Sequence, residues 1–377
     1  MNILLLITTL RKGGAEKNFA YLCTNLLKME PPVTPIVISI FDGYYHDALK
    51  KRNVLTFVIG EGNFLLRIRK ILECAAFIIK NRKTISVSNA FLNHAGAIGT
   101  IIKIMTGIPF IYSIRNTYSI EHPFFANPIS YVCHNIAVKF ADIITCNSLY
   151  VFNKINKLYP SKRVRLIQNA IEISNKPSDH ILEEVKEKYF RGTYKLYAIT
   201  TCNLRNKGKD IETLLKVAGK FSQIGFVIVG GGVLLEKYRN TAKQARLSNV
   251  SFTGHQDNVI PFLFLSDIFI LLTLHEGFPN SVLEAMASQL PVIASNIPQI
   301  SCVLEDRVDC LLVENGNVDN ICQAINTLLL DSNTYNSLIT NALQKLRRVF
   351  SPEIMMAEYI KLYNFYSKKP FNVSMDI

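Results

Sequence analysis

Short apolar runs rich in β-branched residues alternate along this chain with longer amphipathic stretches. In the first half, helical stretches begin near residue 16 and cover 64–80 and 94–105, and the apolar runs occupy residues 3–8, 36–40, 55–59, 85–88, 110–114 and 143–146. Such alternation is typical of a doubly wound parallel sheet with helices on both faces. An α/β fold is therefore the first constraint on this sequence.

The alternation starts again after a polar interval at residues 172–178. Further apolar runs follow at residues 196–200, 226–229, 250–253, 268–272, 292–294 and 311–313. With 377 residues, the chain has the length of two ordinary domains. We expect Rossmann-like domains at residues 1–173 and 174–350, and a C-terminal helix within 351–377 that packs back toward the N-terminal domain. Ligands of such sheets lie beyond the carboxyl ends of the strands, so we expect a site in a cleft between the domains.

The sequence contains no stretch expected to cross a membrane. The first ten residues are apolar, but no basic segment precedes them, so we interpret them as a buried strand and not as a signal peptide. The longest nearly apolar stretch, 259–274, contains Pro261 and Asp267 and is shorter than the ~20 residues of a spanning helix. Eight cysteines without a C-x-x-C pair predict reduced thiols in a cytoplasmic protein.

Positive charge is concentrated in the first half. Residues 1–173 hold 21 Lys and Arg against 9 Asp and Glu, so +12 of the total charge of +13 lies there. This half should attract an anionic partner. No nucleic-acid motif supports DNA or RNA, so an anionic membrane surface is favoured. A basic stretch carries Arg67, Arg69, Lys70, Lys80, Arg82 and Lys83 around Ile71, Leu72, Phe77 and Ile78, and it fits a helix on that surface or a solvated helix face.

Two glycine-rich turns follow predicted strands. Gly13 and Gly14 precede the first helix, where free N–H groups suit an anion, although a tight turn is an alternative interpretation. Gly230, Gly231 and Gly232 follow the strand at 226–229 and indicate either a close approach to a ligand or a simple chain reversal. Neither turn is G-x-G-x-x-G, which disfavours a nicotinamide enzyme.

A basic loop opens a helix in the second half. Arg205, Lys207 and Lys209 lie beside the start of that helix, where positive charges are unfavourable unless an anion binds. The loop therefore predicts a diphosphate site, with a solvated basic loop as the alternative.

Two glutamates eight residues apart stand at 276–287 (EGFPNSVLEAMA). Gly277 and Pro279 make the segment irregular after the strand at 268–272, and we expect Asn280 or Ser281 to cap a helix that carries Glu284 about one turn in. Glu276 is thereby predicted to lie in the cleft, with Glu284 on the helix behind it. The alternative interpretation is that the two carboxylates are unrelated, one a surface residue and the other a partner of the helix dipole.

With these residues in place, the chain resembles the retaining glycosyltransferases of glycosyltransferase family 4 over nearly its whole length. The most specific match is the E-x(7)-E segment running on to 291–295 (PVIAS). Supporting matches are residues 13–16 (GGAE), 113–116 (SIRN), 167–170 (IQNA), 203–210 (NLRNKGKD), 252–255 (FTGH) and 266–269 (SDIF). The resemblance implies a GT-B fold, with an N-terminal acceptor-binding and a C-terminal nucleotide-sugar-binding domain facing across a cleft.

The resemblance also implies roles for single residues. Glu276 would contact donor-sugar hydroxyls, Glu284 would hold the ribose, and Arg205 with Lys207 would neutralise the departing diphosphate. His94 would face the transferred sugar, and Gly14 would approach the diphosphate from the other domain. The remaining donor-binding positions implied are Gly13, Lys209, Gly230, Gly277, Phe278, Pro279, Asn280 and Ser281.

Some positions depart from the family pattern. The spacing from Arg205 to Lys207 is short, so Lys209 is an alternative diphosphate ligand. Ile114 stands where related bacterial enzymes often have Glu, and Asp309-Cys310 stands where Asn-Gly is frequent. His94 has the weakest match, and a capping or buried histidine fits it equally well.

The activity implied is retaining transfer of a hexose or N-acetylhexosamine from a nucleotide diphosphate sugar, preferably UDP-linked, to a lipid-linked saccharide in O-antigen or capsule synthesis. GDP-mannose is the alternative donor. No D-x-D spacing occurs, so no metal or other cofactor is expected. The expected place is the cytoplasmic side of the inner membrane, bound peripherally. A nicotinamide oxidoreductase and a non-catalytic membrane-binding scaffold stay open as other classes.

Overall fold

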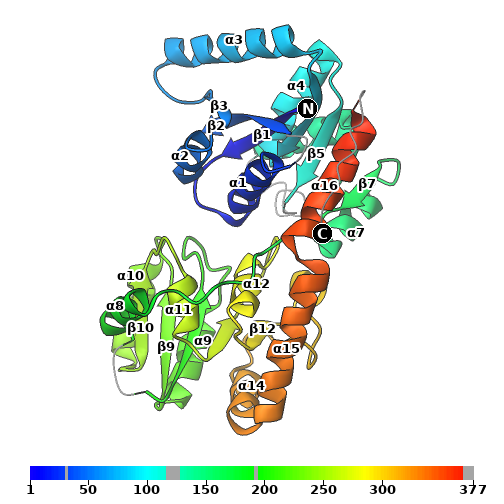
Figure 1. The fold of residues 1–377 in the computed structure, drawn as a ribbon. Helices are drawn as coiled ribbons and strands as arrows, with labels where there is room; N and C mark the ends of the chain where they lie inside the picture. The colour runs from blue at the N-terminus through cyan, green and yellow to red at the C-terminus, as the bar shows by residue number, and fades with distance from the viewer. Residues whose placement is uncertain (30–32, 116–127, 191–193, 368–377) are drawn as a thin grey trace. The chain divides into compact units, whose positions relative to one another are not determined.

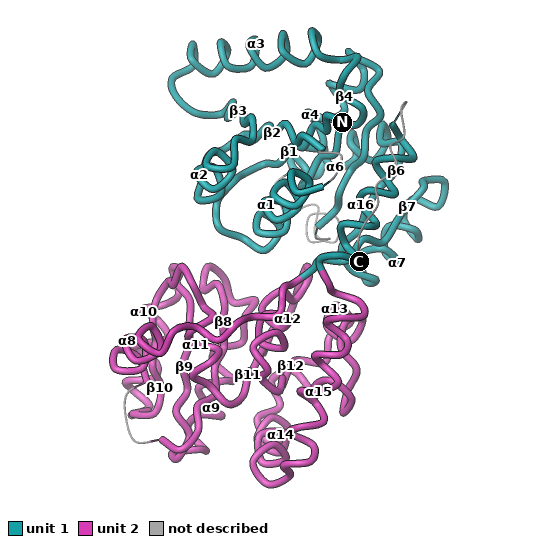
Figure 2. The backbone as a smooth tube through the Cα atoms, viewed as in Figure 1, with its two compact units in different colours: residues 1–170, 352–377 teal, residues 171–351 magenta. Residues whose placement is uncertain are grey.

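The chain divides into two compact units, described here from a computed structural model over residues 1–29, 33–115, 128–190 and 194–367 (Figure 2). Unit 1 comprises residues 1–170 and 352–377, and unit 2 comprises residues 171–351. The sequence predictions at Asn116 and at residues 368–377 lie outside the described residues.

Unit 1 is built on a parallel sheet of order β3-β2-β1-β4-β5-β6-β7. Its strands are β1 (Asn2–Thr9), β2 (Thr34–Phe41), β3 (Leu55–Val58), β4 (Ile85–Phe91), β5 (Phe110–Ile114), β6 (Ile143–Cys146) and β7 (Val164–Leu166). Its helices are α1 (Gly14–Leu26), α2 (Tyr44–Lys50), α3 (Phe64–Asn81), α4 (Asn93–Thr106), α6 (Pro128–Phe140), α7 (Leu149–Leu158) and α16 (Pro352–Tyr366). The edge strand β7 was not predicted from the sequence.

Unit 2 repeats the same plan with a parallel sheet of order β10-β9-β8-β11-β12-β13. Its strands are β8 (Leu196–Thr201), β9 (Ile224–Val229), β10 (Val250–Gly254), β11 (Ile268–Leu271), β12 (Val292–Ser295) and β13 (Leu311–Val313). Its helices are α8 (Asp179–Tyr189), α9 (Ile211–Lys220), α10 (Leu235–Gln244), α11 (Ile260–Phe264), α12 (Asn280–Ala287), α13 (Pro298–Ser301), α14 (Val318–Leu330) and α15 (Ser332–Val349). The prediction of two Rossmann-like α/β domains is confirmed.

The strand β1 shows why these apolar runs form central strands. Successive side chains of a strand point to opposite faces of the sheet. Ile3, Leu5 and Ile7 pack with α1 and α16 on one face, whereas Leu4 and Leu6 pack with α4 and α6 on the other. All five are fully buried, because helices cover both faces.

Helix α16 joins unit 1 from the far end of the chain (Figure 1). Its Tyr359 and Tyr363 are buried in the same core cluster as Leu5 of the central strand β1. Asn89 of β4 donates to the Tyr363 hydroxyl at 2.9 Å, and Arg165 of β7 donates to the Glu358 carboxylate at 2.7 Å. The helix is therefore an integral part of this unit.

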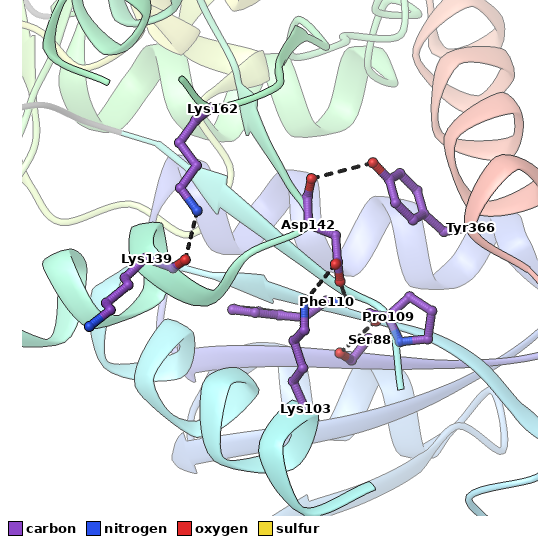
Figure 3. Close-up of polar contacts among 8 residues, drawn as sticks. All are labelled: Ser88, Lys103, Pro109, Phe110, Lys139, Asp142, Lys162 and Tyr366. Atoms are coloured by element: carbon purple, nitrogen blue, oxygen red, sulfur yellow. Dashed lines mark hydrogen bonds and ion pairs between the residues drawn. The ribbon is translucent and has the colours of Figure 1, made fainter. Parts of the chain in front are cut away.

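Asp142 links three elements of unit 1 (Figure 3). Its carboxylate accepts from the Lys103 ammonium of α4 at 2.5 Å and from the Phe110 N–H of β5 at 2.7 Å. Its carbonyl oxygen accepts from the Tyr366 hydroxyl of α16 at 3.4 Å. These contacts fix the end of α4 against the sheet.

All eight cysteines are free, and four of them, Cys23, Cys74, Cys146 and Cys310, are buried. Within the residues that the structure describes, no helix has the length and apolar character needed to span a bilayer.

We predict that Asp142→Ala destabilises unit 1 by about 1 to 3 kcal/mol, because it leaves a half-buried ammonium and a backbone N–H without their acceptor. Urea unfolding measures the change. Asp179→Ala is the matched control, since the exposed Lys176–Asp179 pair contributes about 1 kcal/mol or less. Equal stability losses in the two variants would contradict the prediction.

Candidate active site

The predicted site residues of unit 2 gather where the direction of the sheet connections reverses. Strands β8 and β11 are neighbours, yet the chain runs from β8 outward to β9 and β10 on one side and from β11 to β12 and β13 on the other. Loops diverge at such a switch point, which leaves room for a ligand beyond the carboxyl ends of the strands. The loop after β8 carries Arg205, Lys207 and Lys209, and the loop after β11 carries Glu276.

Lys209 and Glu276 form an ion pair between these two loops. Their side chains are 17% and 14% exposed, so the charges are largely withdrawn from water but still reachable. Burial lowers the pKa of Lys209 to about 8, which leaves the ammonium charged at neutral pH. The pair holds one cation and one carboxylate side by side at the switch point.

Thr273 fixes the two loops to one another. Lys209 and Thr273 form an isolated antiparallel bridge, and the Leu274 N–H donates to the Gly208 carbonyl at 2.9 Å. The fully buried Thr273 hydroxyl lies 3.0 Å from the Gly208 carbonyl oxygen, and the Thr273 N–H donates to Ser295 Oγ at 2.9 Å. Sequence reasoning missed Thr273, although a polar residue directly after the apolar run 268–272 was the available signal.

The three glycines after β9 support the Arg205 loop. A Cβ at Gly230 would lie 1.8 Å from the Cys202 carbonyl oxygen, and one at Gly232 would lie 2.3 Å from the Leu204 carbonyl carbon. The Leu204 N–H donates to the Gly231 carbonyl at 3.0 Å. The close approach that these glycines permit is thus to the neighbouring loop of the protein.

Within that loop, the cations differ in position. Leu204 is fully buried and anchors the loop, whereas Arg205 and Lys207 are exposed. Lys207 is one of the lysines that lower the pKa of Glu212, with Lys237 the principal cause. Lys207 therefore lies near the first turn of α9, and Lys209 is the lysine that contacts Glu276.

The segment from Gly277 to Glu284 enters helix α12 through a buried aromatic anchor. Phe278 packs edge-on against Phe350, with ring centroids 6.1 Å apart, so only its backbone is available to a ligand. The helix begins at Asn280 with Pro279 as N-cap and no side-chain cap. The expectation that Asn280 or Ser281 would cap the helix was wrong, because the chain enters helical geometry one residue earlier. Glu284 is half-buried on the second turn.

Unit 1 also carries its predicted residues at its own switch point, between the neighbouring strands β1 and β4. Gly13 is the N-cap of α1 with an extended φ of −174°, so the turn does not need a left-handed residue. Gly14 is the first residue of that helix, and His94 is the second residue of α4. The roles that the resemblance implies for Gly13, Gly14 and His94 remain predictions.

Polar contacts hold the start of α4, next to His94. Tyr112 donates to Asn93 Oδ1 at 2.8 Å, and Asn93 Nδ2 donates to Ser130 Oγ at 2.9 Å. Buried His134 lies 3.0 Å from the Tyr112 hydroxyl, and burial lowers its pKa to about 4, so it is neutral. Leu92, the N-cap, has a φ of 72°, a strained value for a bulky residue.

Two further motifs of the resemblance meet in unit 1. Arg115 donates from Nη1 to Asn169 Oδ1 at 3.1 Å, and its guanidinium lies 4.6 Å from the centre of the Phe91 ring. Arg115 also donates to the Tyr359 hydroxyl of α16. Arg115 and Asn169, one from each motif, thus contribute to one buried polar cluster.

Comparisons with known proteins show which sequences and structures this chain resembles. The family described as "Glycosyl transferases group 1" matches residues 183–345. The capsular polysaccharide biosynthesis glycosyltransferase CapM of Staphylococcus aureus is 24% identical over 75% of this chain and 77% of its own length. An Escherichia coli UDP-Gal:alpha-D-GlcNAc-diphosphoundecaprenol alpha-1,3-galactosyltransferase is 30% identical, over 33% of each chain.

Among solved structures, Anabaena HepE in complex with UDP and glucose matches with a TM-score of 0.80. The match covers 96% of this chain and 99% of HepE at 19% identity, and at that identity it bears on the fold alone. The family match over residues 183–345 and the fold of the two units together indicate a glycosyltransferase of the GT-B fold.

Proposed function

We propose that the chain is a retaining glycosyltransferase that moves a hexose or N-acetylhexosamine from a UDP-linked donor to a lipid-linked saccharide during bacterial surface polysaccharide synthesis. The observation that carries the proposal is the Lys209–Glu276 pair at the switch point of unit 2, in the loops that lead to α9 and α12. Family 4 membership is proposed on the E-x(7)-E segment that contains this Glu276.

The donor would be held by groups with complementary charge. The diphosphate is anionic, and Lys209, the exposed Arg205 and the positive end of the α12 dipole attract anions. Glu276 would accept hydrogen bonds from sugar hydroxyls, and Glu284 would accept them from the ribose. The UDP-linked donor is supported by two similar proteins, the E. coli UDP-Gal-dependent galactosyltransferase and HepE, whose structure holds UDP and glucose.

Transfer would proceed as negative charge develops on the leaving diphosphate while the sugar becomes oxocarbenium-like. Cations poised at the departing oxygen stabilise that charge, which lowers the barrier. We assign this role to Arg205 and Lys209. We place Lys207 farther from the diphosphate, because it lies near the carboxylate of Glu212. In this proposal no metal ion and no other cofactor takes part.

The acceptor and the location are proposed from charge and from relatives. The E. coli relative acts on a diphosphoundecaprenol-linked sugar, and CapM acts in capsular polysaccharide synthesis, as their names state. The strongly basic first half suits an enzyme that meets such a lipid at the cytoplasmic face of the inner membrane as a peripheral protein.

A panel of UDP-glucose, UDP-galactose, UDP-N-acetylglucosamine and GDP-mannose tests the proposal. A preferred donor should raise the melting temperature and be hydrolysed slowly without acceptor, which is followed by release of the nucleoside diphosphate. If no nucleotide sugar stabilises the protein or is hydrolysed, the proposed function is wrong.

Glu276→Gln should reduce donor turnover on the order of 10²- to 10³-fold, because the neutral amide accepts weaker hydrogen bonds and loses the Lys209 pair. Glutamine is chosen because alanine would leave the largely buried Lys209 ammonium without this acceptor. Glu236→Gln, an exposed change in the same unit, is the control. Unchanged turnover in Glu276→Gln would contradict the assignment of this carboxylate.

UDP affinity should fall as the pH rises through about 8, because Lys209 then loses its charge. In Lys209→Arg the fall should move to higher pH, since guanidinium stays protonated. Titration calorimetry with UDP at a series of pH values measures this, and Lys207→Arg should keep the profile of the wild-type chain. If Lys207→Arg moves the fall in UDP affinity to higher pH and Lys209→Arg does not, the assignment of the two lysines is reversed.

Chelation should leave turnover nearly unchanged if cationic side chains alone neutralise the diphosphate. The measurement is donor hydrolysis before and after dialysis against EDTA. A loss of activity that Mg²⁺ or Mn²⁺ restores would disprove the metal-free part of the proposal.

A further inference from the structure

Helix α3 is packed against unit 1 along only a narrow face. Of its described residues Phe64–Asn81, only Cys74 and Ile78 are buried. Figure 1 shows the helix along the outside of unit 1, above β2 and β3, and its two buried residues share a core cluster with Ile36 and Ile38 of β2. Three of its large apolar side chains, Phe64, Leu65 and Leu72, are 76%, 75% and 63% exposed.

Most of the exposed apolar side chains share one face of α3. Residues three, four and seven positions apart lie on the same side of a helix. We use the name apolar stripe for the five exposed residues that this spacing aligns, which are Phe64, Leu65, Ile68, Leu72 and Ile79. Of the four apolar residues that the sequence analysis placed among the cations, Ile71 and Leu72 are exposed, whereas Ile78 is buried and Phe77 packs on Phe57.

Beside the apolar stripe, a groove of about 330 Å³ lies between α3 and α4. Its walls are Ile71 and Ile78 of α3 and Ile101 and Met105 of α4, with Ile38 and Ile59 among the residues from the sheet side. The α4 wall is held in place by the Lys103–Asp142 pair (Figure 3). The volume is at the lower end of the range of about 300 to 1,000 Å³ that small-molecule sites occupy.

Positive charges border this apolar surface. Residues 64–83 contain the six cations Arg67, Arg69, Lys70, Lys80, Arg82 and Lys83 and a single acid, Glu73, which pairs with Arg69 at 2.7 Å. On the helix, Arg69 and Lys80 lie next to one border of the apolar stripe. A second copy of the chain would bring the same cations against these, whereas an anionic bilayer complements both the charge and the apolar side chains.

We propose that α3 lies in the headgroup region of an anionic lipid bilayer, with the apolar stripe among the acyl chains and one hydrocarbon chain of a bilayer lipid in the α3–α4 groove. Insertion of apolar side chains combined with a basic border supplies the two signals that stable peripheral binding needs. All of these residues lie in unit 1, so the proposal does not depend on the donor chemistry assigned to unit 2.

The absence of tryptophan from the sequence permits a direct test in the full-length chain. Leu72→Trp places an indole on the apolar stripe, and Leu330→Trp places one at an exposed leucine of unit 2, which is 86% exposed. With vesicles of phosphatidylcholine and phosphatidylglycerol, emission from position 72 should shift to shorter wavelength. Lipids brominated in their acyl chains should quench it, while position 330 should be unaffected. Vesicle-bound protein whose position-72 indole stays in water would overturn the proposal.

Ile101→Trp tests the groove separately. Acyl-brominated lipid should quench this indole as well, and protection from quenching while position 72 is quenched would disprove the occupation of the groove by a lipid chain.

Replacing leucine by serine at positions 65 and 72 should weaken vesicle affinity at least about tenfold. Replacing Arg69 and Lys80 by Gln should chiefly remove the preference for phosphatidylglycerol and the sensitivity to salt.

An emission shift at position 72 that grows with protein concentration without vesicles would show that a second copy covers the stripe and would overturn the bilayer assignment. Wild-type vesicle affinity in the serine variant would overturn it equally.

Discussion

The backbone bridge between Lys209 and Thr273 is the constraint on which the candidate site of unit 2 depends. Strands β8 and β11 are adjacent in space but far apart in the chain, and their loops would otherwise diverge. The bridge and the buried Thr273 hydroxyl hold the loops together, so that the Lys209 ammonium meets the Glu276 carboxylate. The charge pair is thus positioned by uncharged backbone contacts, which neither salt nor pH weakens directly.

Unit 1 solves the same problem with different chemistry. Its switch point lies between β1 and β4, and the start of α4 is held by hydrogen bonds from Tyr112 and to Ser130 in place of a backbone bridge. The neutral, buried His134 completes this network without adding a charge. Both units therefore place an N-terminal helix end beside a rigid polar support. Among the described residues, only unit 2 combines this support with a largely buried ammonium, that of Lys209.

The sequence was sufficient for the central strands, because strands buried on both faces appear as continuous apolar runs such as residues 3–8. It was insufficient for β7, whose three residues include the charged Arg165 at the edge of the sheet. The Lys209–Glu276 pair could not be predicted, since pairing over 67 residues depends on strand order. The sequence left open which side of α3 meets the sheet, because periodicity marks an apolar face without indicating what that face packs against.

The membership of α16 in unit 1 has a consequence for the order of folding during synthesis. Unit 2 is a continuous segment and has all of its residues once position 351 has left the ribosome. Unit 1 still lacks Tyr359 and Tyr363 at that point, so the side of its sheet that carries Leu5 stays partly uncovered and the buried Arg115 lacks one of its acceptors. The half that is made first is therefore completed last, and its exposed core needs protection from aggregation for as long as translation continues.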